Sequence, residues 1–237
     1  MEFETELRPA RLVQRYKRFL ADVEDESGQW TVHCPNTGSM LGCAEPGSRV
    51  WLSRSSRRGR KYVYTWELVE MQEGVLVGVH TGRANDLVAE ALDAGLLPDL
   101  QGYRQRRREA RVPEAPMRAD WLLEDPDGGG PPCFVEVKNV TAAVAAGTAC
   151  FPDAVTDRGR RHLEVLADWV GAGGRAAVVF CVQRTDTERV RPAEEIDPAY
   201  ARALRQAAAR GVELAAVRMR PSPGAIVPER ALPVLRE

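Results

Sequence analysis

The stretch that decides the fold is ADWLL, residues 119–123, followed after a loop by CFVEVKNV, residues 133–140. Both runs are mainly apolar, and ionisable or polar side chains interrupt them, which is typical of β-strands. The intervening loop, residues 125–132, holds three glycines and three prolines and favours a turn. We therefore expect two strands that lie side by side.

Three ionisable residues on these strands form the candidate catalytic site. Side chains alternate along a strand, so Glu136 and Lys138 share one face, and Asp120 can lie across from them. Two neighbouring carboxylates suggest a cation between them, and oxygen ligands suit Mg²⁺ or Mn²⁺. Such a metal activates water and neutralises a phosphate oxygen. The alternative is chance, because Glu-x-Lys triplets also occur on exposed strand faces.

Beyond these strands, helical and strand patterns alternate. We predict helices over 157–170 and 198–210, and strands over 176–182 and 212–218. This alternation indicates an α/β domain with a partly parallel sheet. Asn85 is expected to cap an earlier helix, and the proline-rich tail after residue 220 is expected to be irregular.

The first third of the chain has a different pattern. Short β-rich runs occur at residues 30–33, 50–53, 62–69 and 75–80, bounded by Gly, Pro or Ser. Several short strands within some 80 residues predict a small barrel or sandwich. We therefore divide the chain into an all-β domain, residues 1–82, and an α/β domain, residues 83–237.

Composition excludes several classes of protein. The 237 residues carry a net charge of -1 with 44% apolar residues, which excludes a wholly disordered chain. No uninterrupted apolar run is long enough to span a membrane, and the acidic N-terminus is no signal peptide. Five cysteines without a CxxC pair favour a reduced, cytoplasmic protein.

Basic residues cluster in three segments, 7–21, 49–66 and 104–111. Local clusters of this kind bind polyanions even when the total charge is near zero, although solvated loops are an equally simple explanation. The Asn36 turn can offer backbone N–H groups to a phosphate, or can serve only as a tight turn. The candidate DNA-binding residues are Arg15, Lys17, Arg18, Asn36, Arg57, Arg58, Arg158 and His162.

Two further acids are candidates for the site. Glu109 is a candidate third metal ligand, as an acid from an upstream helix, or an ordinary charge within its basic run. Asp153 either lines the cleft or caps the segment that follows it. Arg158 and His162 are four residues apart on a predicted helix, so they share a face that can reach a phosphate.

Four sequence blocks carry a family resemblance. They are RYKRFLADV at 15–23, HCPNTGSM at 33–40, EVK at 136–138 with Val140-Thr141, and FPDAVTDRG at 151–159 with His162-Leu163. Their order resembles the sugar fermentation stimulation protein (SfsA) family. The pattern of Asp, loop and Glu-x-Lys also resembles the PD-(D/E)xK nuclease superfamily. The approach to Asp120 departs from the family, which tends to have Ser-Arg-hydrophobic-Asp-Phe where this chain has MRADW.

The resemblance implies an N-terminal OB-like β-barrel followed by a nuclease-like α/β domain with a mixed central sheet. It also implies non-specific DNA binding through the backbone and regulation of sugar, notably maltose, metabolism. Asp120, Glu136 and Lys138 fall on the nuclease motif. Three functions follow as hypotheses: a Mg²⁺- or Mn²⁺-dependent DNA nuclease, a DNA-binding regulator without catalysis, and an enzyme acting on a phosphorylated sugar. The sequence leaves open whether the chain forms a homo-oligomer.

Overall fold

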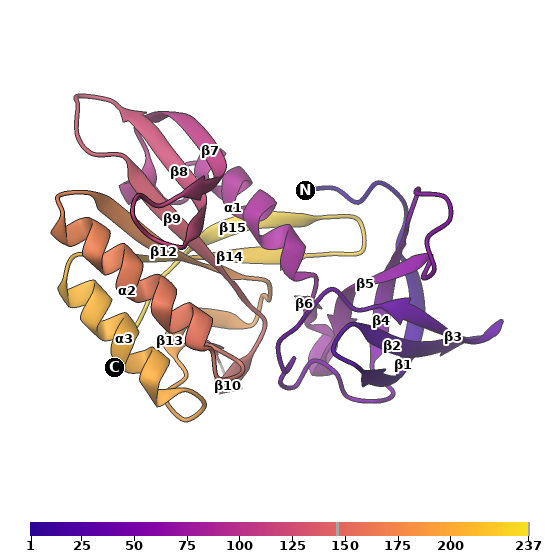
Figure 1. Ribbon diagram of the computed structural model, residues 1–237. Coiled ribbons are helices and arrows are strands. Elements are labelled where there is room, and N and C mark those ends of the chain that lie inside the picture. Colours follow the sequence, from indigo (N-terminus) through magenta and orange to yellow (C-terminus); the bar gives the residue numbers. More distant parts are fainter. Residues whose placement is uncertain (146, 237) are drawn as a thin grey trace.

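The computed structural model describes residues 1–145 and 147–236 and shows two domains side by side. In Figure 1 the first domain is the strand-rich lobe that contains β1–β5, and the second is the lobe that carries α2 and α3. Among the described residues, no helix combines the length and the apolar character needed to cross a bilayer.

The first domain is a closed barrel. Its strands are β1 (Arg8–Tyr16), β2 (Leu20–Asp25), β3 (Gly28–His33), β4 (Arg49–Arg54), β5 (Tyr64–Glu70) and β6 (Leu76–Gly78). They pair in the order β3-β2-β1-β4-β5-β6, and a β3–β5 contact between His33 and Thr65 closes the ring. Trp66 fills the interior together with aliphatic side chains. The predicted OB-like barrel is confirmed.

Two barrel strands, β1 and β2, have no counterpart among the strands predicted from the sequence. Their hairpin turns at Lys17 and Arg18, both at positive φ, where Gly or Asn is the usual signal. Because two cations occupy the turn, the hairpin has the sequence pattern of a basic cluster. The structure shows that Leu12 and Val23 point inward from these strands into the barrel core.

The second domain is built on a mixed six-stranded sheet in the order β15-β14-β12-β9-β8-β7. Its strands are β7 (Tyr103–Arg111), β8 (Arg118–Pro126), β9 (Cys133–Val140), β12 (Arg175–Val182), β14 (Glu213–Pro221) and β15 (Ile226–Leu232). The central strands β9, β12 and β14 are parallel, and the other pairs are antiparallel. The predicted α/β domain with a mixed sheet is confirmed.

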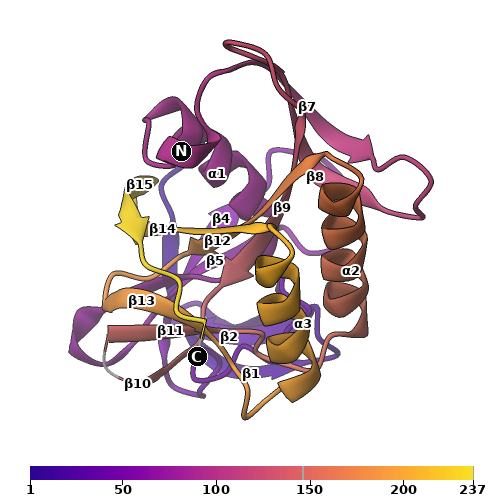
Figure 2. The same cartoon turned by 90° about the vertical axis from the view of Figure 1, so that its left-hand side faces the viewer.

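Helices cover both faces of this sheet. On one face α2 (Asp157–Gly171) and α3 (Pro198–Ala209) bury side chains such as Leu166 and Leu204. On the other face α1 (Ala84–Asp93) buries Leu87 and Val88. Figure 2 shows α2 and α3 side by side, with α1 apart from them. A small second sheet, β10 (Ala143–Ala145), β11 (Gly147–Phe151) and β13 (Thr187–Pro192), extends beyond the end of β9.

Three local expectations were wrong. The tail is not irregular, because β15 pairs with β14, and edge strands tolerate a proline such as Pro228. Asn85 does not cap α1, since the helix already begins at Ala84. Glu109 lies on strand β7, not on a helix, because residues 103–111 pair with β8.

The extreme N-terminus lies against the second domain. The N–H of Phe3 donates to the carbonyl of Gly224 at 3.1 Å, and the N–H of Ile226 donates to the carbonyl of Met1 at 2.9 Å. The terminal ammonium of Met1 also pairs with Glu90 on α1. The barrel is therefore connected to the second domain at both of its ends.

The strand β15 provides a stability test. Ile226 is fully buried against the face that α1 covers, so Ile226→Ala leaves a cavity. We expect a loss of about 2–5 kcal/mol in the free energy of unfolding, measured by urea denaturation. Leu235→Ala, at an exposed position, is the control and should cost less than about 0.5 kcal/mol. Equal stability of the two variants would contradict a packed β15.

Candidate functional site

The pairing of β8 with β9 places Asp120. Trp121 lies opposite Val135, so Asp120 comes beside Glu136 and Val137 in the middle of β9. Its Oδ2 accepts a hydrogen bond from the backbone N–H of Val137 at 2.7 Å, and its Oδ1 accepts one from Asn85 Nδ2 at 2.9 Å. Both oxygens are therefore oriented by fixed donors. Asn85 was missed as a site residue, because it lies 35 positions from Asp120 and forms no motif with it.

Glu136 lies in the middle of β9 with only 5% of its surface exposed. Its Oε1 accepts hydrogen bonds from Lys138 Nζ and from His162 Nδ1, both at 2.7 Å. Its Oε2 is buried and has no hydrogen-bond partner among the described residues. A buried carboxylate oxygen without a partner is costly, so we expect a ligand at this atom.

The two carboxylates differ in their electrostatic environment. Burial, and then the charge of Glu136, raise the pKa of Asp120 above its ordinary value. Burial also opposes ionisation of Glu136, but the hydrogen bond from His162 and the charge of Lys138 lower its pKa overall. Glu136 is therefore held as an anion, and Asp120 is the carboxylate whose ionisation depends more on what binds beside it.

These residues fit a hard divalent cation. Asp120 and Glu136 supply carboxylate oxygens, and the unpartnered Oε2 of Glu136 provides a vacant acceptor. Within residues 1–145 and 147–236, no group of three or more His, Cys, Asp or Glu side chains is arranged to enclose a metal. Mg²⁺ commonly uses one or two protein carboxylates and keeps water or substrate as its other ligands, which suits this donor set.

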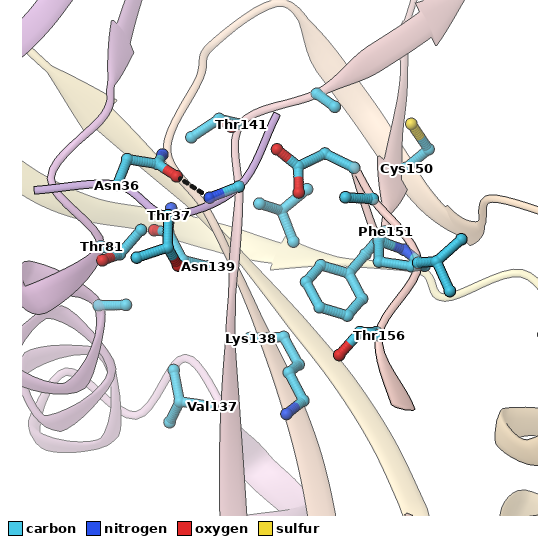
Figure 3. Close-up of a pocket in the computed structure, with 18 of the residues that line it drawn as sticks. Asn36, Thr37, Thr81, Val137, Lys138, Asn139, Thr141, Cys150, Phe151 and Thr156 are labelled. Carbon is cyan, nitrogen blue, oxygen red and sulfur yellow. Dashed lines mark hydrogen bonds between the residues drawn. The ribbon is translucent and has the colours of Figure 1, made fainter. Parts of the chain in front are cut away.

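Asp120 and Lys138 line a cleft of about 390 Å³ between the two domains, and Glu136 lies beneath its lining. Asn36 and Thr37 of the barrel line one side, and the segment from Phe151 to Thr156 lines the other. Figure 3 shows Lys138 of β9 between these two walls, and Asn139 on the side of Thr37 and Thr81. Asp120 and Asn85 also border the cleft, so both domains contribute to it.

Asn36 and Arg15 shape the barrel wall of the cleft. Asn36 is buried, its Nδ2 donates to the carbonyl of Val79, and its Oδ1 accepts from the N–H of Gly38. Arg15 donates to the carbonyl oxygens of Asn36, Gly38 and Ser39. The side chains of both residues are thus engaged in holding the turn, while Lys17 and Arg18 are exposed at the neighbouring hairpin tip.

Asp153 joins the two walls. Its Oδ2 accepts a hydrogen bond from the N–H of Met40 at 2.9 Å, and its carbonyl accepts one from Ser39 Oγ at 2.6 Å. A Cβ added at Gly38 would lie 2.5 Å from Asp153 Oδ2, so a glycine is needed for this close approach. Asp153 lines the cleft and also connects the domains.

Glu109 lies away from the cleft lining. Its side chain is exposed, it adopts a positive φ of 49°, and its carbonyl accepts a hydrogen bond from Arg118. The surrounding cluster, residues 104–111, is largely neutralised. Four of its arginines pair with acids, as Arg104–Asp127, Arg106–Asp93, Arg107–Glu124 and Arg108–Asp86.

The other candidate DNA contacts fall into two groups. Arg57 and Arg58 are exposed in the β4–β5 loop, and neither forms an ion pair within the described residues. Arg158 lies in the first turn of α2 beside the cleft, with its Nε 3.3 Å from His162 Nε2. His162 is mostly buried against Glu136 and so belongs to the carboxylate site.

Comparison with known proteins agrees with this architecture. The model of the sugar fermentation stimulation protein RE domain matches residues 82–225, and that of the SfsA N-terminal OB domain matches residues 13–79. A sugar fermentation stimulation protein homolog of Halorhodospira halophila is 74% identical over 99% of this chain and 98% of its own. One from Alkalilimnicola ehrlichii is 62% identical over 99% of both chains.

A solved structure is also similar. The structure of Pyrococcus furiosus SfsA in complex with Ca²⁺ superimposes with a TM-score of 0.87 at 28% identity, and covers 99% of this chain and 98% of that one. The two domain models together span most of the chain, and the curated relatives extend over nearly all of it. The chain therefore belongs to the sugar fermentation stimulation protein family.

Proposed function

We propose that this protein is a DNA-binding phosphodiesterase that depends on Mg²⁺ or Mn²⁺. The observation that carries the proposal is the buried Oε2 of Glu136, which has no partner within the described residues although Asp120 lies close by in an interdomain cleft. The similar Pyrococcus furiosus protein was solved in complex with Ca²⁺, another hard divalent cation that prefers oxygen ligands.

The residues of the chain have distinct roles in this proposal. Asp120 and Glu136 would hold the metal, which supplies an activated water and neutralises phosphate charge. Asn85 and the N–H of Val137 orient Asp120, and His162 orients Glu136. The ammonium of Lys138, bonded to Glu136, lies where it can stabilise a phosphate oxygen.

DNA binding would rely on exposed cations around the cleft and barrel. Lys17 and Arg18 lie on the hairpin tip beside the cleft wall, and Arg158 lies on the opposite side at the start of α2. Arg57 and Arg58 extend the positive charge along the barrel. Contacts of this kind bind the phosphate backbone without reading sequence.

The second candidate function is a DNA-binding regulator without catalysis. The ion pair between Lys138 and Glu136 favours it, because this pair already neutralises one carboxylate without a metal. The names of the relatives associate them with sugar fermentation, so regulation of sugar metabolism, including maltose, is proposed for either function. The five cysteines are reduced and buried, which supports a cytoplasmic location.

Cleavage assays separate these two functions. In Mg²⁺ or Mn²⁺, we expect the protein to cut DNA, and EDTA to abolish cutting. Asp120→Asn and Lys138→Ala should each reduce the rate at least about a hundredfold, because each removes a charge that acts in the transition state. Asp127→Asn, on an exposed loop, is the control and should keep the wild-type rate.

DNA affinity is measured on the same samples. Binding that persists in both site variants, while cleavage is lost, assigns Asp120 and Lys138 to catalysis. DNA binding without metal-dependent cleavage of single-stranded, duplex or branched DNA would contradict the nuclease and leave the regulator.

The salt dependence of DNA binding tests whether Arg57 and Arg58 of the β4–β5 loop contact phosphates. Removing one contact to a phosphate should reduce the slope of log affinity against log salt by about 0.7–0.9. We therefore expect Arg57→Ala with Arg58→Ala to flatten the slope. The matched control, Arg104→Ala with Arg107→Ala, removes two arginines that already pair with acids and should leave the slope unchanged. Identical slopes for both double variants would exclude the loop as a DNA contact.

The raised pKa of Asp120 predicts a pH dependence of metal affinity. Only the ionised carboxylate binds a metal, so affinity should fall as the pH drops toward this raised pKa, earlier than for an ordinary aspartate. Asn85→Ala removes a hydrogen bond that lowers the pKa of Asp120, and should move this loss to still higher pH. Mn²⁺ titration calorimetry from about pH 7 to about pH 4 measures both. Coincident curves for wild type and Asn85→Ala would contradict the role of Asp120 as ligand.

A further inference from the structure

The candidate catalytic groups lie deep in a small space. Glu136 is 5% exposed, and the side chain of Lys138 is 11% exposed. The cleft lined by Lys138 and Asp120 holds about 390 Å³, a volume typical of sites for small ligands. One nucleotide is comparable in size with such a cleft, whereas a double helix is far larger. A phosphate must therefore enter the cleft to reach these groups.

The cleft is also bridged by contacts between its two walls. The backbone N–H of Met40 and the hydroxyl of Ser39 both bind Asp153 across the domain boundary. Further along, Cys43 Sγ lies 3.6 Å from the carbonyl of Thr141. The domains would have to separate at these contacts to admit a rigid, paired duplex. A single strand is thin and flexible enough to enter without that separation.

Exposed apolar side chains lie in the cleft lining and on two barrel segments that are bonded to it. Five large hydrophobic residues are exposed among those that the structure describes. One of them lies in the cleft lining, and two lie on neighbouring segments of the barrel. They are Phe19 at 50% exposure, Leu41 at 46% and Val155 at 73%. Val155 lines the cleft directly, and Leu41 follows Met40, which contacts Asp153.

Phe19 is connected to the cleft wall by hydrogen bonds. Its carbonyl accepts from the N–H of Cys34, and Arg15 donates to the carbonyls of both Arg18 and Asn36. Lys17 and Arg18 directly precede Phe19 at the hairpin tip. An exposed aromatic ring next to two cations is the combination that binds an unpaired strand, because the ring stacks on a base and the cations contact phosphates.

From this geometry we infer that the substrate is unpaired DNA: single strands, or the frayed and unpaired ends of duplexes. The strand would place bases on the rim formed by Phe19, Leu41 and Val155, and one phosphate at Lys138. The inference rests on the proposed nuclease function and adds the form of its substrate. Base stacking is insensitive to sequence, which agrees with non-specific binding.

Binding measured in EDTA tests the rim without any cleavage. Fluorescence anisotropy of a labelled single strand and of its blunt duplex should show tighter binding of the single strand. Phe19→Ala should weaken single-strand binding by about 5- to 100-fold and change duplex binding by less than about twofold. Phe19→Tyr keeps a stacking ring and should restore single-strand affinity. Because Phe19 is half exposed, neither variant removes a core side chain.

Cleavage in Mn²⁺ completes the experiment. The full-length protein should cut the single strand and the unpaired arms of a splayed duplex, and leave the blunt duplex intact. Equal binding and cleavage of the blunt duplex would overturn this inference while the nuclease function stands. Single-strand binding that Phe19→Ala leaves unchanged would overturn the role of the rim. Failure to bind or cut any DNA would overturn both the inference and the proposed function.

Discussion

The antiparallel pairing of β8 with β9 is the constraint on which the site depends. Its register places Asp120 against the N–H of Val137 and within electrostatic range of Glu136. A shift of one residue would turn Asp120 to the opposite face of the sheet and separate the two carboxylates. The apolar residues of β8 hold this register, because one slip of β8 would also turn Leu122 away from the core cluster that it shares with Phe134.

The site also requires that the two domains keep a fixed position relative to each other. Barrel residues 36–38 form one wall of the cleft, and Asp153 binds the next two residues, Ser39 and Met40. The same turn is connected to the segment that leads into the second domain, since Thr81 donates to the carbonyl of Pro35 and Asn36 donates to the carbonyl of Val79. From there a short segment leads to Asn85, which orients Asp120. Hydrogen bonds and a short stretch of backbone therefore connect the barrel to the carboxylate site.

The sequence alone predicts those strands and helices whose apolar and turn residues form a pattern within the element itself. Strand β9 has the predicted bounds, and α2 starts at the predicted Asp157, because apolar periodicity and turn residues marked both. It missed β7 and β15, whose side chains are mostly charged or include proline, since pairing with a neighbour rather than composition makes them strands. Within the site, strand alternation brought Asp120 and Glu136 together, but the partners Asn85 and His162 come from separate helices. Such contacts depend on tertiary packing and leave no motif.

The docking of Met1 on Ile226 has a consequence for the order of folding events. Met1 and Ile226 are 225 positions apart in the sequence, and the whole barrel lies between them. Domains generally fold as units, so the barrel can form before this contact does. Because the two partners are so far apart along the chain, closing the contact costs loop entropy that only a formed β15 can offset. We therefore expect the N-terminal segment to dock late, after both domains have folded.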